Sequence, residues 1–166
     1  MPPEDIPVIA VDGPSGAGKG TLASLLAKAL GWQLPDSGAL YRVVGYACLL
    51  EGVSWEDHAA VTRIARHLEV AFSTSHDGEI RTAYKGKDVS AQIRTEQSSL
   101  GASTVAVIPS VREALLERQR ELRRRPGLVA DGRDMGTVVF ADAPLKFLLP
   151  SSSKARARSG RSHALG

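Results

Sequence analysis

The first apolar run of the chain extends from Ile6 to Val11 and ends at the polar pair Asp12-Gly13. Apolar residues without polar alternation are typical of a strand that is buried on both faces. A glycine-rich stretch follows, and after it leucines recur at helical spacing. The pattern predicts a strand, a tight turn and a helix from about Lys19 to Leu30, with Gly31 as its C-terminal cap. The expected apolar stripe of that helix consists of Leu22, Leu25, Leu26 and Leu30.

Two further helices are expected in the next part of the chain. Ser37 can cap a helix over about residues 38–50, and the segment Ser54 to Asp57 resembles a capping box that opens a helix ending near Leu68. The apolar stripe of the first of these helices consists of Leu40, Val43, Val44, Ala47 and Leu50. Tyr41, Arg42 and Gly45 fall off that stripe.

The pattern of hydrophobic and polar residues changes after residue 68. Two short strand-like runs flank an Asp-Gly turn, so residues 69–93 are predicted to form a small antiparallel insert. Residues 97–107 are weakly helical in pattern. Pro109 can start a further helix over about residues 111–124, which Pro126-Gly127 stops.

A second buried strand is expected at residues 128–132, with shorter strands at 137–140 and 145–149. Strands that alternate with helices predict an α/β fold with a parallel sheet, with ligands at the carboxyl ends of its strands. We therefore expect one core over residues 1–150, which carries the insert. Residues 151–166 are rich in serine and arginine, and we expect them to form a poorly ordered tail.

Charge gives little support for nucleic-acid binding. The chain carries 21 basic and 18 acidic residues, a net charge of +3. Four of the basic residues lie after Pro150 and no acid does, so residues 1–150 hold 17 basic and 18 acidic residues, a net charge of −1. A nucleic-acid-binding domain would be expected to show basic residues clustered on its body.

A cytoplasmic location and no membrane contact are expected. No apolar run approaches the roughly 20 residues that cross a bilayer. Glu4 and Asp5 stand where a signal peptide would carry positive charge. Cys48 is the single cysteine of the chain and is expected to be a buried thiol. The four histidines show no metal-ligand spacing, so a zinc site is not expected.

The segment from Gly13 to Lys19 carries the strongest chemical signal. Its first and last glycines and its lysine match a phosphate-binding loop (P-loop), in which backbone N–H groups converge on an anion. A chance glycine-rich turn is the alternative, and the strand before the loop and the helix after it argue against that. The usual hydroxyl after the lysine is replaced by Gly20 and arrives at Thr21. Magnesium would then be held through water, Thr21 or a remote acid, and no direct metal ligand is assigned.

A second polar group follows the strand at residues 128–132. Asp131 and Asp134 can position magnesium, directly or through water, although an acid at a strand end can also simply cap a turn. Arg133 lies between acids and is either a structural ion pair or a contact to a second phosphate. Arg42 and Arg112, taken alone, are more typical of solvated side chains, as is the run Arg123 to Arg125.

Several segments of the chain together resemble the bacterial cytidylate kinases of the nucleoside monophosphate kinase group. The matching segments are VDGPSGAGKGT (11–21), DSGALYR (36–42), DVSAQIRTE (88–96), VREALLERQR (111–120) and LVADGRDMGTVVF (128–140). The resemblance implies an α/β P-loop kinase core with a small β insert over the acceptor nucleotide. It also implies ATP-dependent phosphorylation of CMP and dCMP with Mg²⁺. A monomer is expected.

The resemblance also implies roles for individual residues. The ATP phosphates would be held by Gly13, Pro14, Ser15, Gly16, Ala17, Gly18, Lys19, Gly20 and Thr21. The acceptor nucleotide would be bound by Ser37, Tyr41, Arg42, Arg94, Ser103, Arg112, Arg133 and Asp134. Arg42 and Arg133 would contact the acceptor phosphate, and Ser103, Arg112 and Asp134 the cytosine. Lys19, Arg42, Arg133 and Asp134 are the expected catalytic residues.

The resemblance ends near Arg158. Relatives continue with an arginine-rich lid, further helices and a final strand, so the chain is expected to be truncated or frame-shifted, or to use Arg156, Arg158 and Arg161 instead. Two alternatives to a (d)CMP kinase follow. One is a kinase for another small acceptor, and the other is a nucleotide-binding remnant without turnover.

Overall fold

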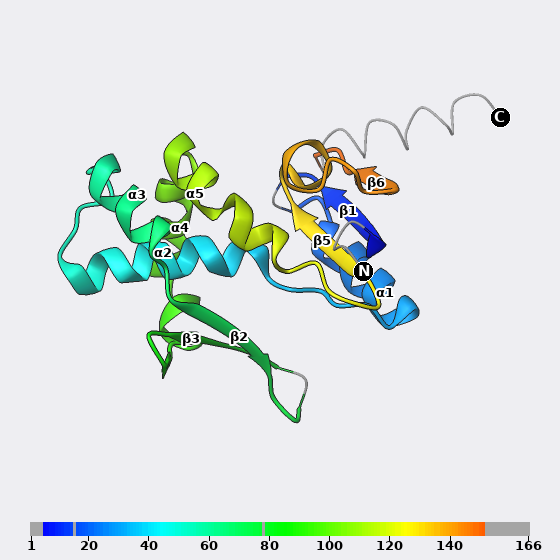
Figure 1. The fold of residues 1–166 in the computed structure, drawn as a ribbon, viewed down its shortest axis with the longest axis horizontal. Helices are drawn as coiled ribbons and strands as arrows, with labels where there is room; N and C mark the ends of the chain where they lie inside the picture. The colour runs from blue at the N-terminus through cyan, green and yellow to red at the C-terminus, as the bar shows by residue number, and fades with distance from the viewer. Residues whose placement is uncertain (1–4, 15, 78, 152–166) are drawn as a thin grey trace. The chain divides into compact units, whose positions relative to one another are not determined.

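The computed structural model describes residues 5–14, 16–77 and 79–151 (Figure 1). The expected tail, apart from Ser151, lies outside the described residues. The chain divides into two compact units. We call Met1–Pro35 with Arg120–Gly166 the sheet unit, and Asp36–Gln119 the helical unit.

The sheet unit is built on three parallel strands, which Figure 1 shows side by side. They are β1 (Val8–Asp12), β5 (Leu128–Gly132) and β6 (Leu145–Leu148), in the order β5-β1-β6. Strand β1 is buried along its whole length because it lies in the centre of the sheet. The predicted parallel α/β architecture is confirmed, and the carboxyl ends of β1 and β5 lie at the same edge.

Helix α1 (Lys19–Leu30) has the predicted bounds, but its apolar face differs from the predicted stripe. Ala23 and Ala27 are buried, whereas Leu25 is 63% exposed and Leu30 is 45% exposed. Alanine lets the helix backbone approach the sheet closely, where α1 contributes to a small core. That core contains Ile9, Val11, Ala23, Ala27 and Val129.

The strand predicted at residues 137–140 is wrong. Residues Met135–Val139 form one turn of π-helix, η3, closed by hydrogen bonds from Val139 N to Asp134 O at 3.2 Å and from Phe140 N to Met135 O at 2.7 Å. An apolar run of this length packs equally well as a strand or as a helical turn, so periodicity alone does not distinguish them.

Arg123 is not a solvated residue at a helix end. Helix α5 (Pro109–Arg120) ends four residues earlier than predicted. The Arg123 side chain is 9% exposed, donates from Nε to the Ile6 carbonyl at 2.6 Å and pairs with Asp142 at 2.8 Å. It therefore joins three separate segments of the sheet unit.

The helical unit contains α2 (Ser37–Glu51), α3 (His58–Arg66), α4 (Glu96–Ala106) and all but the last residue of α5. Its largest fully buried side chains include Leu40, Val43, Val44, Val61, Leu68, Val105, Val111 and Leu115. Leu50 is 59% exposed and does not belong to this core.

Helices α2 and α4 approach closely at two glycines. A Cβ on Gly45 would lie 3.0 Å from the carbonyl carbon of Gly101, and a Cβ on Gly101 would lie 2.7 Å from the Trp55 ring. The Trp55 Nε1 donates to the Gly45 carbonyl at 3.1 Å. Gly45 is buried although it falls off the predicted stripe, because a side chain there would hold the two helices apart.

The predicted N-terminal caps are displaced by one to three residues. Asp36, and not Ser37, precedes α2, and its side chain accepts from Ala39 N. Asp57, and not Ser54, precedes α3, and its side chain accepts from Ala60 N. Aspartate is among the strongest N-caps, because its carboxylate also favours the positive end of the helix.

The small antiparallel sheet is confirmed within the helical unit. It consists of β2 (Val70–Thr74), β3 (Ile80–Tyr84) and β4 (Lys87–Asp88), in the order β2-β3-β4. A 3-10 turn, η2 (Gln92–Arg94), leads from this sheet to α4. None of the helices in the described parts of the chain combines the length and apolar character needed to cross a membrane.

Candidate functional site

The glycine-rich loop connects the carboxyl end of β1 to α1. Gly16 and Gly18 have φ angles of +79° and +85°, which side chains rarely adopt. Apart from the chain neighbours, no atom of the described residues lies within 4 Å of a Cβ built on either glycine, so the loop faces open space there. Gly13 serves packing instead, because its Cβ would lie 2.9 Å from the Leu149 carbonyl oxygen. Ser15 lies outside the described residues.

The N-terminus of α1 lacks the cap that other helices have. Gly18 precedes it without a side-chain hydrogen bond, and its first turn contains no acidic residue. Helices α2, α3 and α4 are capped by Asp36, Asp57 and Thr95. Uncapped N–H groups at the positive end of a helix favour an external anion. Lys19 is the first residue of the helix and is half-buried, and Gly20 and Thr21 are exposed beside it.

Asp12 is a buried acid at the carboxyl end of β1. The sequence pattern marks it only as the end of the first apolar run. Asp12 is 5% exposed, and both of its carboxylate oxygens accept backbone hydrogen bonds. Met135 N donates to Oδ1 at 2.7 Å, and Gly136 N donates to Oδ2 at 2.8 Å. An aspartate directly before a glycine loop was the available signal, but its partners 123 and 124 residues away could not be inferred from it.

The second polar group follows β5, as predicted. Asp131 pairs with Val11 in the parallel ladder and is half-buried. Arg133 is exposed, and Asp134 is half-buried immediately before η3. Because β1 and β5 are parallel neighbours, these residues lie at the same edge of the sheet as the glycine loop.

The helical unit contains a pocket of about 320 Å³. Its walls come from α2, β3, the segment after β4, and η2. The lining residues are Asp36, Ala39, Arg42, Ile80, Thr82, Ser90, Ile93 and Arg94. The pocket thus combines two guanidinium groups with aliphatic side chains, which suits a small ligand with an anionic group and an apolar surface.

Arg42 is oriented by the residue that caps α2. The Asp36 carboxylate accepts from Ala39 N through Oδ1 at 3.2 Å and from Arg42 Nη1 through Oδ2 at 3.4 Å. The Arg42 side chain is 37% exposed, so its guanidinium group is accessible to a ligand. The helix cap therefore also sets the position of a pocket cation.

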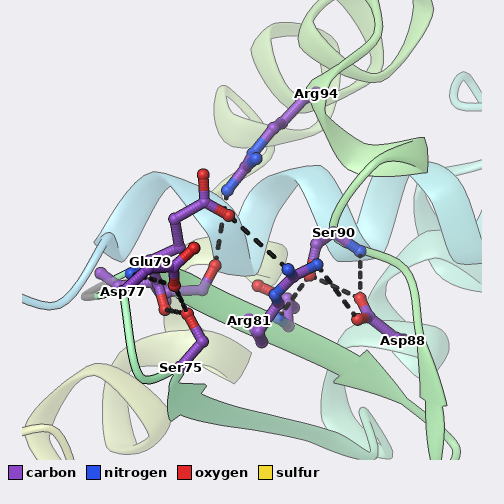
Figure 2. Close-up of polar contacts among 9 residues, drawn as sticks. Ser75, Asp77, Glu79, Arg81, Asp88, Ser90 and Arg94 are labelled. Carbon is purple, nitrogen blue, oxygen red and sulfur yellow. Dashed lines mark hydrogen bonds and ion pairs between the residues drawn. The ribbon is translucent and has the colours of Figure 1, made fainter.

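Polar contacts hold β3, β4 and the residues that follow them beside the pocket (Figure 2). Arg81 lies between Glu79 and Asp88, at 3.7 Å and 3.6 Å. Asp88 accepts from Ser90 Oγ at 2.5 Å and from Ser90 N at 2.9 Å, and these hydrogen bonds lower the pKa of Asp88. Arg94 Nη2 donates to the Ile80 carbonyl at 3.4 Å.

Three predicted acceptor residues of the helical unit whose side chains the structure describes do not line this pocket. Tyr41 receives a hydrogen bond from Gln119 Nε2 at 3.5 Å. Ser103 is exposed and donates to the Ser99 carbonyl at 3.1 Å, and Arg112 Nη1 donates to the Ala106 carbonyl at 3.0 Å. Ser37 begins α2, and its side chain lies outside the described part of the structure. Arg42 and Arg94 are the predicted residues that the structure brings together.

Cys48 is a core residue and lies away from this pocket. It is fully buried in α2, as predicted, and desolvation raises its pKa to about 11. A thiol with this pKa is protonated at neutral pH and is therefore a poor nucleophile.

The chain matches known proteins over most of its length. A family model described as cytidylate kinase matches residues 9–164. The match extends past Arg158, near which the resemblance was expected to end. The chain is 55% identical over 154 residues to a cytidylate kinase of Pseudomonas paraeruginosa, covering 92% of this chain and 67% of the relative. It is 53% identical over 156 residues to a cytidylate kinase of Shewanella putrefaciens, covering 93% and 68%. The chain thus spans about two thirds of the length of these relatives, and it belongs to the cytidylate kinase family of phosphotransferases.

Proposed function

We propose that this chain transfers the γ-phosphoryl group of ATP to CMP and dCMP, giving CDP or dCDP and ADP. Family membership supports a nucleoside monophosphate kinase. The observation that carries the donor half of the proposal is the open glycine loop that leads into the uncapped N-terminus of α1.

The loop has the properties that a polyphosphate requires. Gly16 and Gly18 leave their side of the loop free of side chains, and the first N–H groups of α1 have no side-chain acceptor from its cap residue. Lys19 at the first helical position would neutralise the β- and γ-phosphates. We assign Gly13 to Thr21 to the donor.

The polar edge of the sheet unit also suits Mg²⁺. The described residues contain no group of three or more His, Cys, Asp or Glu side chains that could hold a metal ion. Magnesium often keeps several waters and binds through one or two carboxylates plus substrate phosphates, which fits Asp131 near the end of β5 and the hydroxyl of Thr21. When bound, Mg²⁺ neutralises the charge that develops on the transferred phosphoryl group.

For the acceptor, we propose that Arg42 and Arg94 bind the phosphate of CMP, and that Arg133 contributes a further contact to it. Two arginines in one pocket support this assignment, because guanidinium groups bind phosphate oxygens in pairs. On the family resemblance we also assign Ser37 and Tyr41 to the acceptor nucleotide, although Tyr41 does not line this pocket.

We propose that Ser103, Arg112 and Asp134 recognise the base. A carboxylate accepts a hydrogen bond from the amino group of cytosine, which uracil lacks. An arginine donates to the ring nitrogen and carbonyl oxygen. This assignment rests on the family resemblance and on the chemistry of the residues.

The reaction requires little covalent chemistry from the protein. An oxygen of the CMP phosphate forms a bond to the γ-phosphorus as the bond from that phosphorus to the β–γ bridging oxygen breaks, and ADP leaves. The chain's residues would hold the two phosphates in line and supply positive charge from Lys19, Arg42 and Arg133.

A coupled assay with ATP and Mg²⁺ over CMP, dCMP, UMP, AMP and shikimate tests the proposal. We expect the highest kcat/KM for CMP or dCMP. A higher kcat/KM for UMP or another acceptor would contradict the assignment of CMP and dCMP as substrates. Tight CMP and ATP binding by calorimetry without turnover would instead identify a non-catalytic binding protein. We also expect a cytoplasmic monomer that acts on small nucleotides and not on nucleic acid.

A further inference from the structure

The geometry of the sheet unit assigns Asp12 a role that the motif does not give it: we propose that Asp12 is a positioning residue, whose carboxylate fixes the turn that presents Arg133 and Asp134. The inference rests on the proposed function, because those two residues are assigned there to the acceptor nucleotide. It concerns residues of the sheet unit alone.

Asp12 holds both ends of this turn. At the first end, its backbone pairs with Gly132 across the β1–β5 ladder, and Gly13 N donates to the Gly132 carbonyl at 3.2 Å. At the second end, its carboxylate accepts from Met135 N at 2.7 Å and Gly136 N at 2.8 Å. Arg133 and Asp134 are the only residues between these two fixed points.

Asp12 is itself held from the other side of the sheet. Leu149 N donates to the Asp12 carbonyl at 2.8 Å, so the residue is bound by both neighbouring strands. At 5% exposure, its carboxylate is shielded from water, and each oxygen already accepts a short hydrogen bond. These bonds suit a structural anchor for the turn better than a general base, because a base needs an accessible lone pair.

The turn leaves little room for adjustment. A Cβ on Gly132 would lie 2.8 Å from the Met135 side chain, and a Cβ on Gly136 would lie 3.3 Å from the Ala10 Cβ and 3.1 Å from Lys146. Asp134 has backbone angles of φ −138° and ψ 24°, so the chain leaves the strand direction at this residue. Without the carboxylate, two buried N–H groups would lose their acceptor, and the turn would move to find water.

The test is Asp12→Asn, which keeps the shape but offers only one acceptor to the two N–H groups. We expect the ratio of kcat/KM for CMP to that for UMP to fall by about ten-fold or more, because small misplacements of positioned groups cost up to about 10²-fold. The KM for ATP should stay nearly constant, because the substitution leaves the main-chain pairing of β1 in place.

Val139→Ala is the matched control. Val139 is buried in the same π-helical turn, so its truncation weakens the unit without removing an acceptor from Met135 N or Gly136 N. We expect it to lower thermal stability and to keep the CMP to UMP ratio. If Asp12 has only a structural role, Asp12→Asn should also lower thermal stability and keep the CMP to UMP ratio. An unchanged ratio in Asp12→Asn would overturn the proposal.

Gly136→Ala tests the same turn from its other side and decides the question if Asp12→Asn does not fold. Its new methyl group would press on Ala10 and tilt the peptide that donates to Asp12. The expected result is again a lower CMP to UMP ratio at an unchanged KM for ATP, and an unchanged ratio would overturn the proposal.

The proposed function can fail independently of the positioning role of Asp12. If the wild-type chain does not turn over CMP, that proposal fails, and calorimetric affinities for CMP and UMP replace the kinetic ratio in the same set of variants. A CMP to UMP affinity ratio that is the same in wild type and Asp12→Asn overturns the positioning role. A reduced ratio in Asp12→Asn and an unchanged ratio in Val139→Ala support it.

Discussion

The two units differ in which atoms they offer to a ligand. The sheet unit offers main-chain groups: the glycine loop and the uncapped start of α1 present N–H groups, and Asp12 fixes a second turn through two more. The helical unit offers side chains, since Arg42 and Arg94 reach one pocket from α2 and η2. The first arrangement depends on which conformations the backbone can adopt, and the second on which side chains the fold brings together.

This difference predicts different responses to substitution. A side chain in the helical unit can be removed with a loss confined to the ligand group that it contacts. In the sheet unit, a single substitution that moves the backbone would disturb several N–H groups at once. Lys19 is an exception there, because it adds a single charge to a site otherwise made of main-chain groups. The following variants test the comparison.

Lys19→Ala should have the largest effect. We expect kcat/KM to fall by about 10²- to 10³-fold, because no other group of the loop supplies full positive charge to the β- and γ-phosphates. Steady-state kinetics with ATP and CMP measures the loss. Lys28→Ala is the control, since Lys28 is exposed in the last turn of the same helix. Wild-type kinetics in Lys19→Ala would contradict the donor assignment.

Arg42→Ala should raise the KM for CMP by about 10- to 100-fold, the amount expected for one lost charge-assisted hydrogen bond to phosphate. The KM for ATP should stay constant if the two units divide their ligands as proposed. Arg63→Ala removes an exposed arginine from the last turn of α3 and serves as the control. If Arg42→Ala raises the KM for ATP as much as the KM for CMP, the two units do not divide their ligands as proposed.

Asp134→Ala should narrow discrimination between CMP and UMP by about 10-fold, mainly by lowering efficiency with CMP. Competition between the two acceptors in one reaction gives the ratio directly. Glu121→Ala removes an exposed acid from the same unit and should leave the ratio unchanged. If the ratio stays constant in Asp134→Ala, this carboxylate does not recognise the base.

The glycine loop of the sheet unit is more predictable from sequence than the pocket of the helical unit, for a physical reason. Glycines and a lysine at fixed spacing between a buried strand and a helix specify a local conformation, so the bounds of α1 follow from neighbouring residues. The pocket in the helical unit is lined by residues that lie far apart in the sequence, such as Arg42, Ile80 and Arg94. Pattern alone left Arg42 as a solvated side chain.

The errors have the same origin. The π-helical turn at residues 135–139 has the composition of a strand, and what fixes it is a carboxylate more than 120 residues earlier. Leu25 and Leu30 have helical spacing but face outward, because the strands of the sheet accept the alanine face of α1. Local periodicity identifies an amphipathic element, and tertiary packing then decides which of its faces is buried.

The smallest expected effect concerns the outer contacts of the pocket wall. Hydrogen bonds from Ser90 lower the pKa of Asp88 below its ordinary value of 3.8, so the folded hairpin favours the charged carboxylate. The stabilisation is therefore present above the unfolded pKa and is lost as the pH falls through the folded pKa. Asp88 is exposed, which limits the effect on the KM for CMP to less than about five-fold.

Asp88→Asn should reproduce the acid form at neutral pH. We expect the Ser90 amide to exchange faster with solvent and the KM for CMP to rise slightly, with the KM for ATP unchanged. Hydrogen exchange followed by NMR between pH 3 and pH 6 measures the first effect. Asp57→Asn is the control, because Asp57 caps α3 and does not line the pocket. If Asp88→Asn and Asp57→Asn change the KM for CMP equally, the β3–β4 wall does not shape the pocket through Ser90, and the pocket depends on its two arginines alone.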